Sequence, residues 1–78
     1  MLTLLTHNGG NAMEQHFYVL YNVNEKALYA DTPSGLGYTI NILYADRYES
    51  YEEAKEYLSY FKSPQEWEVK KVTMSIEL

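Results

Sequence analysis

Residues 50–62 have the clearest helical pattern in this chain, and they constrain its fold more than any other feature. Ser50 is a preferred N-cap residue, and Glu53 follows it at the spacing of a capping box. Apolar side chains recur along one face of the expected helix, at Tyr51, Ala54, Leu58 and Phe61. A helix of about 12 residues is marginal in isolation, so this apolar stripe has to pack on another element.

The sequence on either side of this helix is typical of strands and turns. Residues 17–23 are aromatic and β-branched and are apolar at both parities, which predicts a central strand or one whose second face is covered by a partner. Turn residues at 22–25 and the run 26–31 predict a hairpin that returns along this strand. A short strand is expected at 38–40, followed by a short turn or a single helical turn at 41–46.

Residues 66–78 alternate as a last strand does, but the alternation changes phase at Lys70 and Lys71. This change of phase predicts a β-bulge or a change of partner. Together the elements predict an α+β fold, in which a small antiparallel sheet of three or four strands carries one helix packed on one face. The expected order is β-β-β-α-β.

The first twelve residues are expected to be a poorly ordered leader or extension, and residues 13–78 a single α+β domain. Residues 1–6 are apolar, but they are too few to span a bilayer and lack the basic start of a signal peptide. Codons for Gly9 and Gly10 can spell a bacterial ribosome-binding sequence at a suitable distance before Met13. We therefore expect translation to start naturally at Met13.

Seventy-eight residues without cysteine predict one small domain that no disulfide or thiolate metal site holds together. Eleven acidic residues against six lysines and arginines give a net charge of -5. This balance argues against direct binding of nucleic acid or of a membrane, because phosphate groups are bound by Lys and Arg, and it permits a basic protein partner. The absence of cysteine fits the reducing cytoplasm of a bacterial host cell, where we place the protein.

The sequence contains no recognisable catalytic, metal-binding or cofactor-binding motif, and we predict that the protein is not an enzyme and uses no cofactor. The two histidines, His7 and His16, lack the spacing of a zinc site. The glycine-containing loop at 32–37 has no phosphate-binding pattern and no lysine. The acidic residues between Asp46 and Glu56 lack the spacing of an EF-hand calcium loop.

The expected helix carries its acidic residues opposite the apolar stripe. The members of this acidic face are Glu49, Glu52, Glu53 and Glu56, flanked by Tyr57 and Tyr60. Neighbours at this spacing lie about 5–6 Å apart, close to the spacing of phosphates along a nucleic-acid strand. The acidic face is either a solvated helix surface, interrupted by Lys55, or a nucleic-acid mimic that occupies a basic site on another protein.

A second candidate surface is the sheet face that one helix leaves uncovered. We expect this self-association surface to contain Tyr18, Leu20, Leu28, Trp67 and Val69. Such an apolar face is large for a monomer, and a twofold homodimer is the commonest way to cover it. Two alternatives to a binding module are therefore a homodimeric structural or accessory domain and a small-molecule-binding domain with its site at a dimer interface.

The run of residues 38–45, then Tyr48 to Ser50 and Glu53 with Ala54, followed by an all-strand C-terminus, resembles short proteins of bacterial phages and mobile elements. The resemblance is a pattern of fold and carries no active-site residues. Such genomes also encode small acidic inhibitors of host defence systems, including anti-CRISPR proteins. The resemblance implies a non-enzymatic, acidic protein-binding protein, and in its narrowest form an inhibitor of a host nucleic-acid-binding defence protein.

Overall fold

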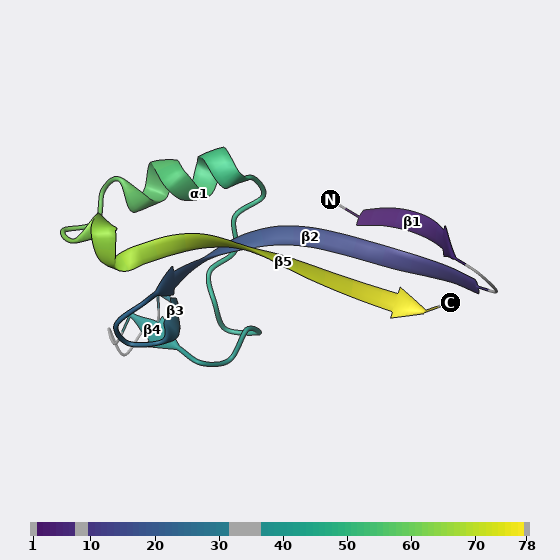
Figure 1. Cartoon of the computed structure of the whole chain (residues 1–78), viewed down its shortest axis with the longest axis horizontal. Helices are drawn as coiled ribbons and strands as arrows, with labels where there is room; N and C mark the ends of the chain where they lie inside the picture. Colours follow the sequence, from purple (N-terminus) through teal and green to yellow (C-terminus); the bar gives the residue numbers. More distant parts are fainter. Residues whose placement is uncertain (1, 8–9, 32–36, 78) are drawn as a thin grey trace.

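The computed structural model describes residues 2–7, 10–31 and 37–77, whose course Figure 1 shows. The elements are β1 (Leu2–His7), β2 (Gly10–Asn22), β3 (Ala27–Tyr29), β4 (Tyr38–Thr39), α1 (Tyr51–Leu58), the 3₁₀ turn η1 (Pro64–Glu66) and β5 (Trp67–Glu77). Every strand pair is antiparallel, and the strands form one sheet. The α+β class with one helix on an antiparallel sheet is therefore confirmed, and the sheet gains an additional strand from β1.

β2 is the centre of the sheet because strands pair along both of its edges. β5 runs along one edge over residues 12–22 in an unbroken register. The other edge is shared by β1 over residues 10–15, by a bridge between Tyr18 and Tyr48, and by β3 over residues 21–22. A central strand was predicted because apolar residues occupy both alternating faces of residues 17–23. The pairing of β2 along both edges agrees with this prediction.

Side chains of β2 alternate between two covered faces. On the helix face, the face under α1, Leu20 is completely buried and packs with Tyr48, Ala54 and Leu58. On the opposite face, which we call the coil face, Phe17, Val19 and Ala45 are buried, with Leu28, Ile42 and Val72 packed around them. The coil that links β4 to α1 therefore covers the sheet from below while α1 covers it from above (Figure 1).

The change of phase at Lys70 and Lys71 does not mark a bulge, and that prediction is wrong. The register between β2 and β5 continues through both lysines without a shift. Val69 packs on the helix face, whereas Val72 packs on the coil face. The phase of apolar residues changes because a different element covers the sheet on either side of this point.

α1 begins as predicted. The backbone N–H of Glu53 donates to Ser50 Oγ over 3.0 Å, and Glu53 Oε2 accepts a 3.2 Å bond from the backbone N–H of Glu49. Acidic residues in the first turn also suit the positive end of the helix dipole. Ser50 and Glu53 thus satisfy two N–H groups at the start of the helix.

α1 ends at Leu58, earlier than the predicted end at Lys62. The backbone N–H groups of Tyr60 and Phe61 donate to carbonyl groups three residues back, which is the tighter spacing of a 3₁₀ turn. This tightening carries Phe61 off the line of the helix, where it packs against the helix-face core. Of the predicted apolar stripe, Ala54 and Leu58 are buried and Phe61 is half-buried, whereas Tyr51 is 48% exposed and does not belong to the core.

β1 occupies residues that the sequence predicted to be a leader or extension. It pairs with the first part of β2, from Leu2 opposite Gln15 to His7 opposite Gly10. The expected boundary before Met13 falls inside β2 rather than at the start of a strand. A natural start of translation at Met13 stays a prediction.

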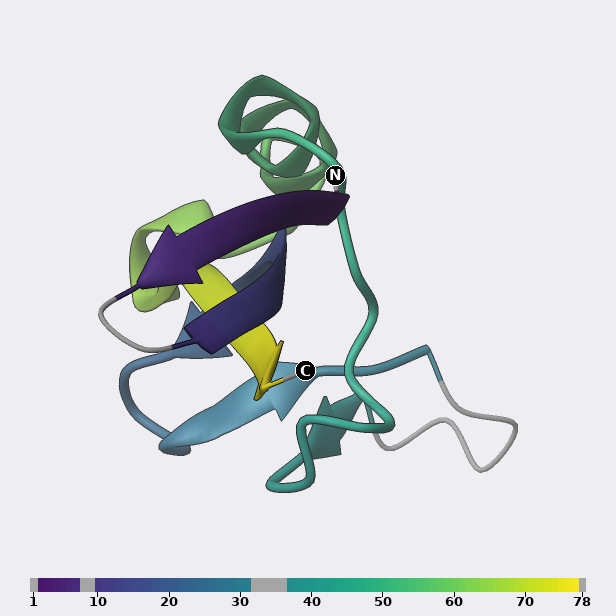
Figure 2. The same ribbon diagram turned by 90° about the vertical axis from the view of Figure 1, so that its right-hand side faces the viewer.

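Beyond the helix, β1, β2 and β5 continue as an arm made of residues 2–7, 10–16 and 73–77. Figure 1 shows that α1 and the β3–β4 region lie at the other end of the molecule, and that both chain ends lie on the arm side. Figure 2 looks along the long axis from the arm end and shows α1 above the strands and the β3–β4 region below them. The arm gives the molecule an elongated shape, with principal extents of 47, 24 and 21 Å. The core accordingly occupies only one end of the long β2–β5 ladder.

Leu20→Ala tests whether the helix-face core dominates stability. Leu20 is completely buried, so its truncation removes apolar contacts and leaves a cavity, and we expect a loss of about 2–5 kcal/mol in the free energy of unfolding. Leu43→Ala is the matched control. The Leu43 side chain is 65% exposed, so its truncation should lower the free energy of unfolding by no more than about 0.5 kcal/mol. Urea denaturation of both variants measures the difference, and equal losses would contradict this account of the core.

Candidate functional site

Six aromatic rings pack together where α1, β3, β4 and β5 meet. The members of this ring cluster are Tyr29, Tyr38, Tyr48, Tyr57, Phe61 and Trp67. Phe61 lies at the centre, with ring centroids 5.0 Å from Tyr29 and 5.1 Å from Trp67. Most pairs are tilted or edge-to-face, the arrangement that the charge distribution of aromatic rings favours.

A groove of ≈ 390 Å³ opens on one side of the ring cluster. Its walls include the rings of Tyr38, Phe61 and Trp67, and Lys62 and Ser63 add polar groups. Tyr38 and Trp67 are stacked with centroids 5.7 Å apart and planes inclined by only 6°. Tyr38 remains 42% exposed, so the groove presents an aromatic surface with a positive charge nearby. Such a surface suits a flat or extended apolar group.

Two tyrosines of the ring cluster have altered acidity. A hydrogen bond with Tyr57, followed by burial and nearby negative charges, raises the pKa of Tyr29 to about 12. Burial and the negative charge of Asp46 raise the pKa of Tyr48 further. The Tyr48 hydroxyl is buried without a hydrogen-bond partner among the described residues. A tyrosine is already neutral at physiological pH, and the raised pKa keeps both side chains neutral into the alkaline range.

Three members of the acidic face, Glu52, Glu53 and Glu56, lie on α1, and Glu49 lies just before its N-cap. Glu49, Glu52, Glu53 and Glu56 are all exposed. Glu53 is partly committed to the start of the helix, because it accepts the bond from Glu49. Glu52 and Glu56 have no hydrogen bond or ion pair through their side chains within the described part of the chain.

The two tyrosines assigned to the acidic face differ in their surroundings. Tyr60 is 78% exposed and takes part in no ring contact with the other described residues. Tyr57 instead belongs to the ring cluster, with its centroid 5.3 Å from that of Tyr48 and 39% of its surface exposed. Tyr60 is thus a free surface ring, whereas Tyr57 mainly supports the core.

The predicted self-association surface does not exist as one face, and this prediction is wrong. Leu20 is completely buried under α1, where Tyr18, Trp67 and Val69 pack around the same core. Leu28 packs on the coil face. The alternation of a strand shows which residues share a face, but it does not show which face the helix will cover. α1 covers the face of Leu20, which was expected to stay open.

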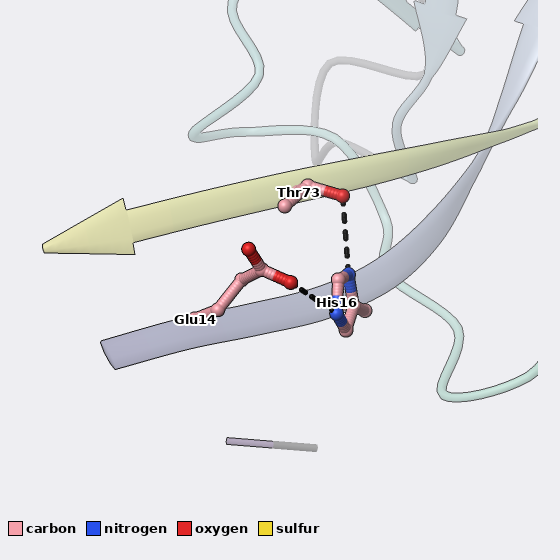
Figure 3. A network of polar contacts seen from close by, with 3 residues as sticks. All are labelled: Glu14, His16 and Thr73. Atoms are coloured by element: carbon pink, nitrogen blue, oxygen red, sulfur yellow. Dashed lines mark hydrogen bonds and ion pairs between the residues drawn. The ribbon is translucent and has the colours of Figure 1, made fainter. Parts of the chain in front are cut away.

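A polar cluster that the sequence did not predict lies on the arm, and Figure 3 shows it. His16 Nε2 lies 2.7 Å from Glu14 Oε1, and its Nδ1 lies 3.1 Å from Thr73 Oγ1. A hydroxyl, an imidazole and a carboxylate in this order also occur in hydrolases. Here, however, Thr73 is exposed on a strand, and the groove formed by described residues lies in the other half of the molecule. We interpret the cluster as a cross-strand polar contact.

The described residues form neither a metal-binding cluster nor a membrane-spanning helix. No group of three or more His, Cys, Asp or Glu side chains there could hold a metal ion. No helix there is long and apolar enough to cross a membrane. No protein-family model, no curated protein and no solved structure matches this chain.

Sequence reasoning missed the groove as well as the polar cluster. Nine tyrosines in 78 residues are a signal of an aromatic surface, and Trp67 was expected on the self-association surface. Tyr38 and Trp67, however, are far apart in sequence and come together only through the β3–β4 pairing and the turn after α1. The strand at 38–40 could be predicted from its pattern, but its position beside Trp67 could not.

The raised pKa values of Tyr29 and Tyr48 predict a loss of stability in alkali. An unfolded tyrosine loses its proton near pH 10, whereas folded Tyr29 keeps its proton up to about pH 12. Over this interval the unfolded state binds fewer protons than the folded state, so stability is constant below about pH 10 and falls as the pH rises towards about 12. Urea denaturation at about pH 9 and about pH 11 measures the fall.

Phenylalanine substitutions identify the residues responsible. Tyr29→Phe and Tyr48→Phe should each reduce the alkaline loss of stability, because they remove a group that titrates differently in the two states. Tyr60→Phe is the matched control, since this ring is 78% exposed, and it should leave the loss unchanged. An alkaline loss that all three variants share equally would show that these environments are not its cause.

Proposed function

We propose that this protein is a non-enzymatic protein-binding module whose contact surface is the solvent side of α1. The observation that carries the proposal is the row formed by Glu52, Glu56 and Tyr60. All three side chains are exposed, and within the described residues the fold uses none of them for a hydrogen bond, an ion pair or a ring contact. Residues that the fold does not need are available for a partner.

The chemistry of this row suits a basic partner surface. Residues four positions apart on a helix are neighbours, so Glu52 and Glu56 place carboxylates on successive turns of α1, and Glu49 adds a third carboxylate just before the N-cap. Charge complementarity of this kind raises the rate of association and selects against acidic partners. Tyr60 follows directly after the helix and adds aromatic contact area, which is the residue type that interfaces favour. The net charge of -5 also favours association with a basic partner.

In its narrower form, the proposal names the partner as a nucleic-acid-binding protein of a bacterial host. The resemblance to phage and mobile-element proteins supports this form, as does the similarity between the spacing of the carboxylates and that of phosphates. The module would then occupy, in the bacterial cytoplasm, the basic site that nucleic acid otherwise fills. The alternative of a small-molecule-binding domain is supported by one observation, the ring-lined groove beside Tyr38 and Trp67. That groove is formed by residues of a single chain, whereas this alternative expected the site at a dimer interface.

Charge reversal at Glu52 and Glu56 tests the proposal. Affinity capture from a bacterial lysate identifies the partner, and calorimetric titration of the purified partner then gives the dissociation constant at several salt concentrations. The double variant Glu52→Lys/Glu56→Lys should weaken binding by at least about tenfold, and the effect should shrink at high salt, where charges are screened. Glu53 is left intact because its side chain holds the start of the helix.

The matched control reverses two exposed acids away from α1, in the double variant Glu25→Lys/Asp31→Lys. It has the same net charge as the test variant, so only the position of the charges differs. Equal binding by the two double variants would contradict the proposal. Tyr38→Ala completes the set, because a loss of binding confined to this variant would move the contact surface to the groove.

A further inference from the structure

β5 has an open edge. Among the described residues it pairs with β2 and with no other strand, so its second edge faces away from the sheet. In an antiparallel ladder, each residue directs both its N–H and its C=O to the same side. Tyr18 exchanges both of its bonds with Tyr48, at 2.8 Å each, on the far edge of β2. Its neighbours in β2 therefore direct their backbone groups towards β5.

The same alternation fixes which groups of β5 are unpaired. Val72 lies opposite Phe17, a neighbour of Tyr18, so Val72 bonds to β2. One residue further on, Thr73 directs its N–H and C=O to the open edge, and so does Ser75. Unpaired backbone groups in a row are a template for another strand.

The arm half of β5 also carries an uncovered apolar stripe on its coil face. Met74 is 40% exposed and Ile76 is 62% exposed, and Met13 of β2 lies opposite Ile76. Lysines, which commonly protect open edges, occur at positions 70 and 71, but the five residues from Val72 to Ile76 carry no charge. The second half of β5 thus combines unpaired backbone groups with uncovered apolar side chains.

We propose that a second copy of this chain pairs with the open edge of β5, antiparallel and about a twofold axis that passes through Met74. A twofold interface brings the same residues together from both copies. With the axis perpendicular to the sheet, the coil faces of the two copies lie on the same side, and their apolar stripes join into one surface.

The residues in the second half of β5 match in this register. With Met74 opposite Met74, Val72 lies opposite Ile76 of the second copy, and Lys71 lies opposite Glu77. Thr73 and Ser75 of the two copies then face each other as hydrogen-bonded pairs. A shift by two residues in either direction removes Lys71 from its position opposite Glu77 and breaks this match of charges.

The pairing leaves the solvent side of α1 free, because α1 lies at the other end of each molecule (Figure 1). Two bodies 47 Å long that overlap along a seven-residue strand, about 23 Å, give a dimer about 70 Å long. The two acidic faces lie near its opposite ends. The proposed function and the proposed dimer thus use different surfaces and can fail independently.

Sedimentation velocity of the full chain over a range of concentrations tests the dimer. We expect a reversible monomer–dimer equilibrium. Small-angle scattering of the dimer should give a maximum dimension of about 70 Å rather than the 47 Å of one chain. Met74→Glu places two like charges opposite each other on the axis. It should weaken the dimer and raise its dissociation constant by about tenfold or more. Ile40→Glu, at a side chain that is 90% exposed, is the matched control and should leave the constant unchanged.

Two further variants test the edge and the register. Ser75→Pro removes an N–H that points away from β2, so it should block the dimer while the internal ladder stays intact. Lys71→Glu should weaken the dimer, and the double variant Lys71→Glu/Glu77→Lys should restore it. Circular dichroism confirms that each variant is folded.

A wild-type chain that stays monomeric up to about 1 mM overturns the proposal. So does a dimer that Met74→Glu and Ser75→Pro leave unchanged, and so does a failure of the charge swap to restore the dimer. A monomer that binds an extended peptide along β5 would show that the edge accepts a different occupant, which also contradicts the proposal.

Discussion

The backbone ladder between β2 and β5 is the interaction on which the rest of the structure depends. It holds Leu20 opposite Val69 on the helix face and Phe17 opposite Val72 on the coil face, so a single ladder organises two small cores. α1 has only eight residues and is too short to be stable alone. Its position therefore follows from the apolar surface that the ladder presents, and so does that of the coil below.

The elements with strong local signals could be predicted from the sequence. Apolar residues at both parities of 17–23 indicated the central strand, and Ser50 with Glu53 indicated the start of α1. Relations between elements could not be predicted. The covered face, the earlier end of the helix at Leu58 and the contact of Tyr38 with Trp67 all depend on packing between distant segments.

The predicted sites divide in the same way. The exposed side of α1 was found because acidic residues at helical spacing mark a solvent face, and the structure exposes Glu52 and Glu56. The self-association surface was misplaced because both faces of β2 are apolar in sequence, and only the packing of α1 distinguishes them. The exposed stripe at Met74 and Ile76 lies further along the ladder, where neither α1 nor the coil covers it.

Hydrogen exchange of the backbone amides, followed by nuclear magnetic resonance, tests most directly whether the β2–β5 ladder organises the fold. The account predicts that the slowest amides belong to Phe17 and Val19, which direct their N–H groups to β5 between the two cores, and that these amides exchange only when the whole chain unfolds. Amides of α1 should exchange faster. The opposite order, with α1 the most protected and the β2–β5 amides exchanging early, would contradict the account.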